Sequence, residues 1–119
     1  MPRRDLPPFR DLRGFISHLE ERGELVRVRE PISVVHEITE IHRRTLRAGG
    51  PALLFESPVL PDGAAATMPV LVNLFGTRQR VAWGFGVESD RIDELGDELT
   101  ALREPRPPRD FADVMSKLP

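Results

Sequence analysis

The sequence of 119 residues contains no cysteine, which excludes structural disulfides, thiolate catalysis and cysteine-ligated metals. No apolar run approaches the roughly 20 residues that a membrane-spanning helix needs, so no transmembrane segment is expected. The start MPRRDLPPFR is basic but has no apolar stretch behind it, unlike a secretory signal. Basic blocks are also missing. The 17 basic and 19 acidic residues are mixed along the chain, with a net charge of −2, which argues against nucleic-acid binding. By default, we expect a cytoplasmic protein.

The composition is that of a soluble globular domain. Hydrophobic residues make up 39% of the chain and charged residues 30%, which argues against disorder. A chain of this length is enough for one domain and buries roughly two-thirds of the surface that its unfolded form exposes. A core without disulfides or metals is therefore feasible.

The sequence predicts three long helices and one short helix. Apolar residues recur at helical spacing on one face of each long helix, as Leu12, Phe15 and Leu19 do in the first. A capping residue precedes each helix, and a glycine can end the first two. The predicted ranges with their caps are Asp11 to Arg22, Ser33 to Ala48, Thr77 to about Phe85, and Ser89 or Asp90 to about Glu104.

Three segments are expected to be strands. In Leu25 to Ile32, valines alternate with arginines, which is typical of a strand with one wet face. Ala52 to Glu56 and Pro69 to Phe75 are continuously apolar and predict buried strands, separated by a turn at Pro61-Asp62-Gly63. Interleaved helices and strands predict an α/β or α+β fold, with a small mixed β-sheet packed by several helices in a single domain.

Both ends of the chain differ from this pattern. Residues 1–8 contain three prolines and no periodicity, so we expect a loose arm. The proline-rich run EPRPPRD reads as a linker, and Phe111 to Leu118 begins another amphipathic helix. We therefore predict an amino-terminal α/β domain over residues 1–104, followed over 105–119 by a linker and the start of another unit.

Three histidines and several carboxylates were considered as site residues. His36-Glu37 resembles the start of a zinc-binding HExxH helix, but position 40 is Glu. His42 lies about 240° around the helix from His36 at ~100° per residue, so no third ligand is evident. His18 is expected at the surface or at its boundary. The adjacent acidic pairs do not converge on one point and indicate solvated faces; they are Glu20/Glu21 and Asp97/Glu98.

The stretch NLFGTRQRVAWGFG, Asn73 to Gly86, leaves two readings open. Gly84-Phe85-Gly86 lacks the third glycine of a dinucleotide fingerprint. Gly76 before a helix opening at Thr77 could bind an anion, with Arg78 and Arg80 adding charge. Alternatively, Gly76 turns the chain, Thr77 caps the helix and the arginines face water. On the residues alone, we assign no catalytic, cofactor-binding or metal-binding residue.

The chain from Phe9 to Pro119 nevertheless resembles the amino-terminal part of UbiD-type decarboxylases. The segments that carry the resemblance are FRDLRGFISHLEERGELVRV, HEITEIHRRTLRAGGPALLFESP, MPVLVNLFGTRQRVAWGFG and LREPRPPRDFADVMSKLP. The name-giving member of that family is 3-octaprenyl-4-hydroxybenzoate carboxy-lyase, of ubiquinone biosynthesis. Such proteins are several times longer than this chain.

The resemblance implies a lyase that removes CO₂ non-oxidatively from an aromatic or α,β-unsaturated acid. Family members bind prenylated FMN with Mn²⁺ and K⁺, and we expect the full-length protein to form a homo-oligomer. Their flavin ligands, metal ligands and catalytic acid/base set lie in a central domain, so none can be carried onto a position here. The partner that the resemblance implies is the remainder of the same polypeptide.

Three hypotheses follow. In the first, this is a structural amino-terminal domain, silent alone, in which Asn73–Gly86 is a strand, a capped turn and a helix. In the second, it is a stand-alone binding or regulatory module that kept the fold without the enzyme. In the third, it is a small enzyme that uses an anion site at Gly76–Arg80.

Overall fold

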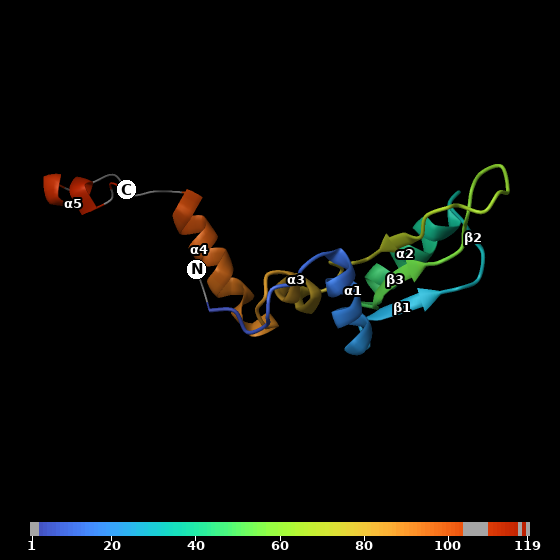
Figure 1. Cartoon of the computed structure of the whole chain (residues 1–119), viewed down its shortest axis with the longest axis horizontal. Helices are drawn as coiled ribbons and strands as arrows, with labels where there is room; N and C mark the ends of the chain where they lie inside the picture. The colour runs from blue at the N-terminus through green and yellow to red at the C-terminus, as the bar shows by residue number, and fades with distance from the viewer. Residues whose placement is uncertain (1–2, 104–109, 117, 119) are drawn as a thin grey trace.

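The computed structural model describes residues 3–103, 110–116 and 118 (Figure 1). The helices and strands of this part of the chain follow the order α1(Leu12–Glu21), β1(Leu25–Val28), β2(Ile32–Ser33), α2(Glu37–Arg47), β3(Ala52–Phe55), β4(Pro58–Val59), β5(Val70–Val72), α3(Arg78–Gly84), the 3₁₀ turn η1(Ser89–Arg91), α4(Ile92–Arg103) and α5(Phe111–Ser116). The mixed α/β fold predicted from the sequence is confirmed. Among the described helices, none is long and apolar enough to cross a bilayer.

Helix α1 begins and ends where its sequence signals predict. The Asp11 carboxylate accepts a hydrogen bond from the Gly14 amide at 2.8 Å, which satisfies one of the open donors of the first turn. Gly23 follows the helix with φ +72°, a left-handed conformation that costs glycine little. The face of α1 that holds Phe15 and Leu19 is buried.

Helix α2 begins later than predicted. Ser33 does not cap it. Instead, Ile32–Ser33 pairs as strand β2 with β4, and the next amide, that of Val34, donates to the Val59 carbonyl. A turn then brings the chain to His36, which has φ +67° and stands at the N-cap of α2. The prediction failed because strand pairing took the backbone groups that a longer helix would have used.

The main sheet has the strand order β1-β3-β5. β1 and β3 are parallel, joined by the segment that contains α2, and β3 and β5 are antiparallel. β3 is buried at all four positions, as predicted, whereas β5 is shorter than predicted and only partly buried. At the predicted turn, the Asp62 carboxylate accepts from the Ala64 amide and Gly63 has φ +86°. β2 and β4 form a separate parallel pair.

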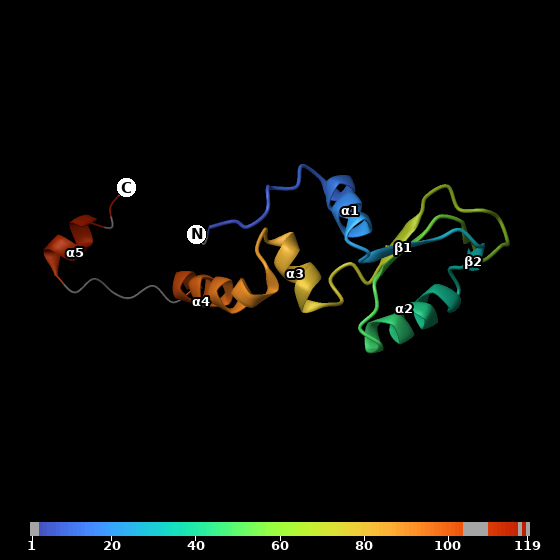
Figure 2. The same ribbon diagram turned by 90° about the horizontal axis from the view of Figure 1, so that it is seen from below.

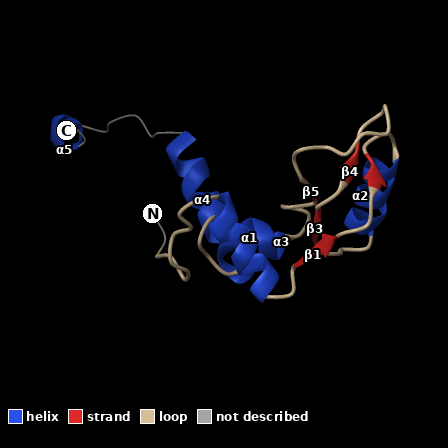
Figure 3. Cartoon of the chain, turned by 45° about the vertical axis from the view of Figure 1, so that its right-hand side comes forward, coloured by secondary structure: helices blue, strands red, loops and turns tan. Residues whose placement is uncertain are grey.

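The central strands carry apolar residues on both faces, and helices cover each face. On one side, Ile38 of α2 packs with Leu53 and Phe55. On the other, Phe15 and Leu19 of α1 and Trp83 of α3 pack over the opposite face of β3, at Ala52 and Leu54. Figure 2 shows α1 and α2 on opposite sides of the strands. Figure 3 shows the strands gathered toward one end of the molecule, with α4 on the other side of α1 and α3.

Two further predictions about the ends of the domain are wrong. Described residues of the amino-terminal arm are held rather than loose, because the Asp5 and Leu6 amides both donate to the Gly86 carbonyl. Neither Ser89 nor Asp90 caps the last long helix. The N-cap of η1 is Glu88, whose side chain makes no capping bond.

The domain boundary at residues 104/105 stays a prediction. Residues 104–109, which hold most of the predicted linker, lie outside the described residues. Beyond them, Phe111–Ser116 forms α5, so the predicted amphipathic turn is helical, and its residues Phe111 and Met115 are exposed.

Candidate functional site

The segment Asn73–Gly86 folds as a turn and a capped helix. The Thr77 hydroxyl accepts a hydrogen bond from the Arg80 amide, which confirms Thr77 as the N-cap of α3. Asn73 has φ +59°, and its side-chain amide donates to the carbonyls of Gly50 and Pro51 at 3.2 and 2.9 Å. The turn is thereby tied to the loop that precedes β3.

Arg80 does not face water. The reading in which both arginines face water is therefore wrong for Arg80. Its side chain is fully buried. The guanidinium donates to the Glu24 carboxylate at 3.0 Å and to three backbone carbonyls at 3.0–3.1 Å, those of Gly50, Asn73 and Leu74. These partners lie where β1 and β3 begin and where β5 has just ended, so Arg80 fastens α3 to one end of the sheet.

This geometry argues against an anion site at Gly76–Arg80. Most of the N–H donors of Arg80 are already engaged by protein oxygens, and the group is closed to solvent. Arg78 is exposed but pairs with Asp93 at 2.8 Å and donates to the Ser89 carbonyl. The third hypothesis therefore loses both of its charged groups.

The spacing of residues in α3 carries a signal for the burial of Arg80. Arg80 precedes Trp83 by three residues and Gly84 by four, so all three share one face of α3. Because Trp83 was bound to be buried, a cation on the same face needed a partner such as Glu24.

The histidines of the zinc comparison do not come together. His36 is exposed at the N-cap of α2. Glu40 pairs with Arg44 at 3.0 Å and with Arg43 at 3.2 Å, and the bond from Arg44 lowers the pKa of its carboxyl. Across the described ranges, no three His, Asp or Glu side chains gather as metal ligands.

The acidic pairs belong to the surface. Glu20 accepts two hydrogen bonds from Arg27, which lower the pKa of its carboxyl, while Glu21 and Asp97 are exposed. Nothing in this arrangement places two carboxylates on a common target.

His18 lies at the boundary of the core, as predicted. Its ring centroid lies 5.0 Å from that of Trp83, edge-on, and 5.1 Å from that of Phe9. Its Nε2 atom is buried without a hydrogen-bond partner among the described residues. Burial, together with the nearby charge of Arg22, lowers the pKa of His18 below its ordinary value.

This environment predicts a loss of stability on mild acidification. The unfolded chain protonates His18 at a higher pH than the folded chain does, so stability is full above the unfolded pKa and falls as the pH drops below about 6.5. We expect the urea midpoint to fall from about pH 7.5 to about pH 5.5 and expect His18→Gln to flatten that slope. His36→Gln is the matched control and should leave the slope intact. An equal slope in the His18 variant would contradict the assignment.

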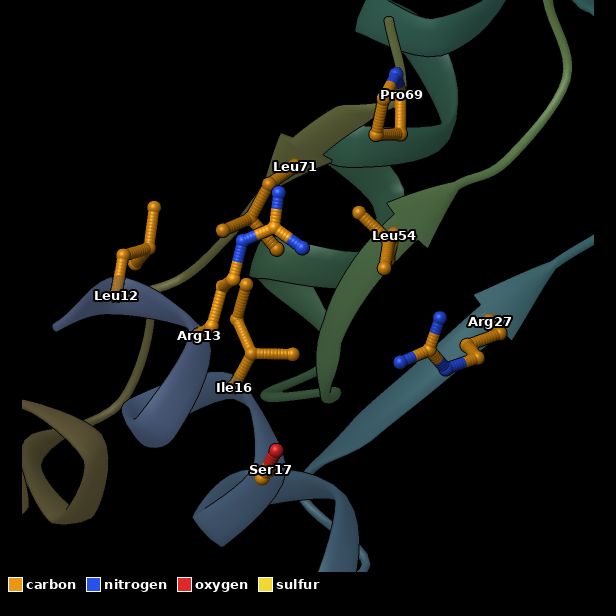
Figure 4. Close-up of a pocket in the computed structure, with 8 residues that line it drawn as sticks. All are labelled: Leu12, Arg13, Ile16, Ser17, Arg27, Leu54, Pro69 and Leu71. Atoms are coloured by element: carbon orange, nitrogen blue, oxygen red, sulfur yellow. The ribbon is translucent and has the colours of Figure 1, made fainter.

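A groove of about 470 Å³ lies between α1 and the sheet. Figure 4 shows its lining, with Arg13 of α1 drawn between Leu12 and Leu54 and Arg27 of β1 beyond Leu54; the lining residues are Leu12, Arg13, Ile16, Ser17, Arg27, Leu54, Pro69 and Leu71. Arg27 pairs with Glu20 and Glu56. Among the described residues, Arg13 has no hydrogen bond or ion pair. The sequence reasoning missed this groove, although Leu12 had been placed on the apolar stripe of α1.

The family comparison agrees with the resemblance seen in the sequence. The family model described as the 3-octaprenyl-4-hydroxybenzoate carboxy-lyase N-terminal domain, UbiD_N, matches residues 16–99. The match includes β1, β3, β5 and all of α3.

Solved structures with a similar fold are also found. Two structures of vanillic acid decarboxylase from Sedimentibacter hydroxybenzoicus, both in the open form, are each 28% identical to this chain with a TM-score of 0.60. Each match covers 71% of this chain but only 17% of the decarboxylase chain. The chain thus spans about one-sixth of the length of these enzymes.

Proposed function

Because this chain belongs to the UbiD_N family, the amino-terminal domain of 3-octaprenyl-4-hydroxybenzoate carboxy-lyases, we propose that it serves as the amino-terminal domain of a UbiD-like decarboxylase. The full-length enzyme would remove CO₂ from an aromatic or α,β-unsaturated acid, of which 3-octaprenyl-4-hydroxybenzoate is one example. Its prenylated FMN, Mn²⁺ and K⁺ would be held by another part of the polypeptide. In this role the domain is structural and inactive alone.

The main support for the proposal is the way in which the described polar groups bond within the domain. The buried cation of Arg80 donates its hydrogen bonds to Glu24 and to backbone carbonyls. Within the described residues, no three potential metal ligands lie close together. These side chains do not fit a flavin phosphate or a divalent metal ion. No step of the reaction is therefore assigned to them.

The open groove supports a docking role. Helix α1 leaves the part of the β3–β5 face around Leu71 and Pro69 open as a groove. Most of its lining residues are apolar, and Arg13, which has no hydrogen bond or ion pair among the described residues, is also part of the lining (Figure 4). An apolar segment of the same polypeptide with a carboxylate is the occupant that this chemistry favours.

We expect the 119-residue protein to bind neither FMN nor prenylated FMN. Titration of FMN against the purified protein, followed by flavin fluorescence, should show no saturation up to about 100 μM, a concentration at which even binding of about −5.5 kcal/mol would be visible. A full-length protein loaded with prenylated FMN is the positive control. Stoichiometric binding of flavin by the short chain would contradict the proposal.

The alternative is a stand-alone module, and the gene distinguishes the two. An open reading frame that continues for several hundred codons supports the enzyme domain, whereas a stop after Pro119 supports the module. Where the frame continues, the long protein with its cofactor should release CO₂ from aryl or acrylic acids. The short chain should release none under the same conditions.

A further inference from the structure

The amino-terminal arm closes over the junction between α3 and α4. The Asp5 and Leu6 amides donate to the Gly86 carbonyl at 2.8 and 3.2 Å. Leu6 and Phe9 pack against the core cluster of α1, α3 and the sheet, and the Phe9 ring meets Phe15 edge-on at 4.9 Å. Both views show the arm running beside this junction before it enters α1 (Figures 1 and 2). The arm therefore touches the body of the domain and the start of α4 together.

The Asp5 carboxylate makes two further links. One oxygen accepts from the Glu88 amide at 2.9 Å and the other from the Arg91 guanidinium at 2.5 Å. Arg91 also donates to the Arg3 carbonyl at 2.7 Å. The Asp5 and Arg91 side chains are only 28% and 24% exposed, so solvent screens this pair less than an ordinary surface pair.

Asp5 provides a hydrogen-bond acceptor at the start of η1, just before α4. Glu88 stands at the N-cap of η1 without a capping bond from its own side chain. The Glu88 carboxylate accepts instead from Gln79 and Trp83 of α3, at 3.2 Å each. The backbone amide of Glu88 donates to the Asp5 carboxylate, more than 80 residues earlier in the chain. An anion at a helix start also interacts favourably with the helix dipole. The hydrogen bond from Glu88 is the main cause that lowers the pKa of Asp5.

Apart from these contacts at its first turn and the bond from Arg78 to the Ser89 carbonyl, little fixes the direction of α4. Leu95 is its one buried residue, while Leu99 and Leu102 are 49% and 74% exposed (Figure 1). A second ion pair, between Arg78 and Asp93, is exposed on both sides and is expected to contribute little. The orientation of the helix therefore depends on its first turn.

We propose that the amino-terminal arm is a strap that sets the orientation of α4 on the domain, with Asp5 as its positioning residue. The strap is a property of this chain by itself. Its use, placing the segment that follows α4 toward the cofactor-binding part of the enzyme, rests on the proposed function. Arg91 is the strap's anchor on η1.

A spin-label distance tests the strap directly. Because the chain has no cysteine, Thr39→Cys on α2 and Asp97→Cys on α4 give a unique labelled pair. We expect a narrow distance distribution in the parent and a distribution at least about twice as wide after Asp5→Ala, since the helix start loses its anchor. Hydrogen exchange of the Glu88 amide should rise at least about tenfold.

Two matched variants keep the test decisive. Glu94→Gln removes the other ion pair of Arg91, with the first turn of α4, and should leave the distribution narrow. Asp5→Asn keeps an acceptor but loses the charge, so it should widen the distribution less than Asp5→Ala does. If the alanine variant fails to fold, the width measured for Asp5→Asn tests the strap in its place. A broad distribution in the parent, or widening by Arg78→Gln but not by the Asp5 variants, would overturn the strap. None of these measurements depends on decarboxylase activity. The strap and the proposed function can therefore be contradicted independently of each other.

Discussion

Replacing Arg80 by methionine is expected to reduce the free energy of unfolding by about 3–5 kcal/mol. Methionine fills much of the same space but leaves the buried carbonyls of Gly50, Asn73 and Leu74 without their donor, and leaves Glu24 without its cation. Because small domains are stable by only about 5–15 kcal/mol, this change brings the protein close to unfolding. The cost arises from the orphaned partners more than from the lost charge.

Urea denaturation followed by the fluorescence of the single tryptophan, Trp83, measures this effect. Arg78→Met is the matched control, two residues earlier on α3, and its exposed side chain should shift stability by no more than about 0.5 kcal/mol. Arg80→Lys keeps the charge without the planar fork and should fall between the two. Equal midpoints for the Arg78 and Arg80 methionine variants would show that the buried network stabilises nothing.

Gly76→Ala is expected to cost about 2–4 kcal/mol, although it adds a single methyl group. A Cβ at this position would lie 2.6 Å from the Asn73 side-chain carbon Cγ and closer still to its Oδ1 oxygen. Asn73 cannot move away cheaply, because its amide holds the carbonyls of Gly50 and Pro51. The substitution therefore forces a choice between a clash and the loss of buried hydrogen bonds.

The matched control is a second Gly→Ala change, at Gly96 in the interior of α4. An added Cβ there meets nothing within 4 Å, so alanine should stabilise the helix by about 1 kcal/mol through its higher helix propensity. Thermal unfolding of the two variants should thus shift in opposite directions. A Gly76 variant as stable as the parent would show that the turn relaxes without cost.

Local signals predicted the helices well where the chain uses its own side chains. Asp11 and Thr77 cap α1 and α3 as expected, since a capping bond spans only three residues. The start of α2 was wrong because a distant segment intervened, when β4 paired with Ile32–Ser33. The cap of α4 was wrong because the helical turn begins earlier, with η1 after Glu88, whose amide donates to the distant Asp5.

The resemblance to a decarboxylase family was readable from the sequence because it extends over long segments, and the family match over residues 16–99 agrees with it. The groove beside α1 and the set of hydrogen bonds around Arg80 were not readable from local spacing. Each is made by residues that are far apart in the chain, as Arg13 and Leu71 are in the groove.

By itself, the sequence determined the fold class, the apolar faces of most helices and the absence of thiol chemistry, because these depend on composition and on spacing within one element. Only the tertiary structure decided which polar groups were buried, which amino-terminal residues were held, and where the sheet stayed open. Those outcomes depend on partners 50 or more residues apart, such as Glu24 with Arg80 and Asp5 with Arg91. No local pattern encodes such pairs, since the free energy that fixes them exists only once the chain has folded.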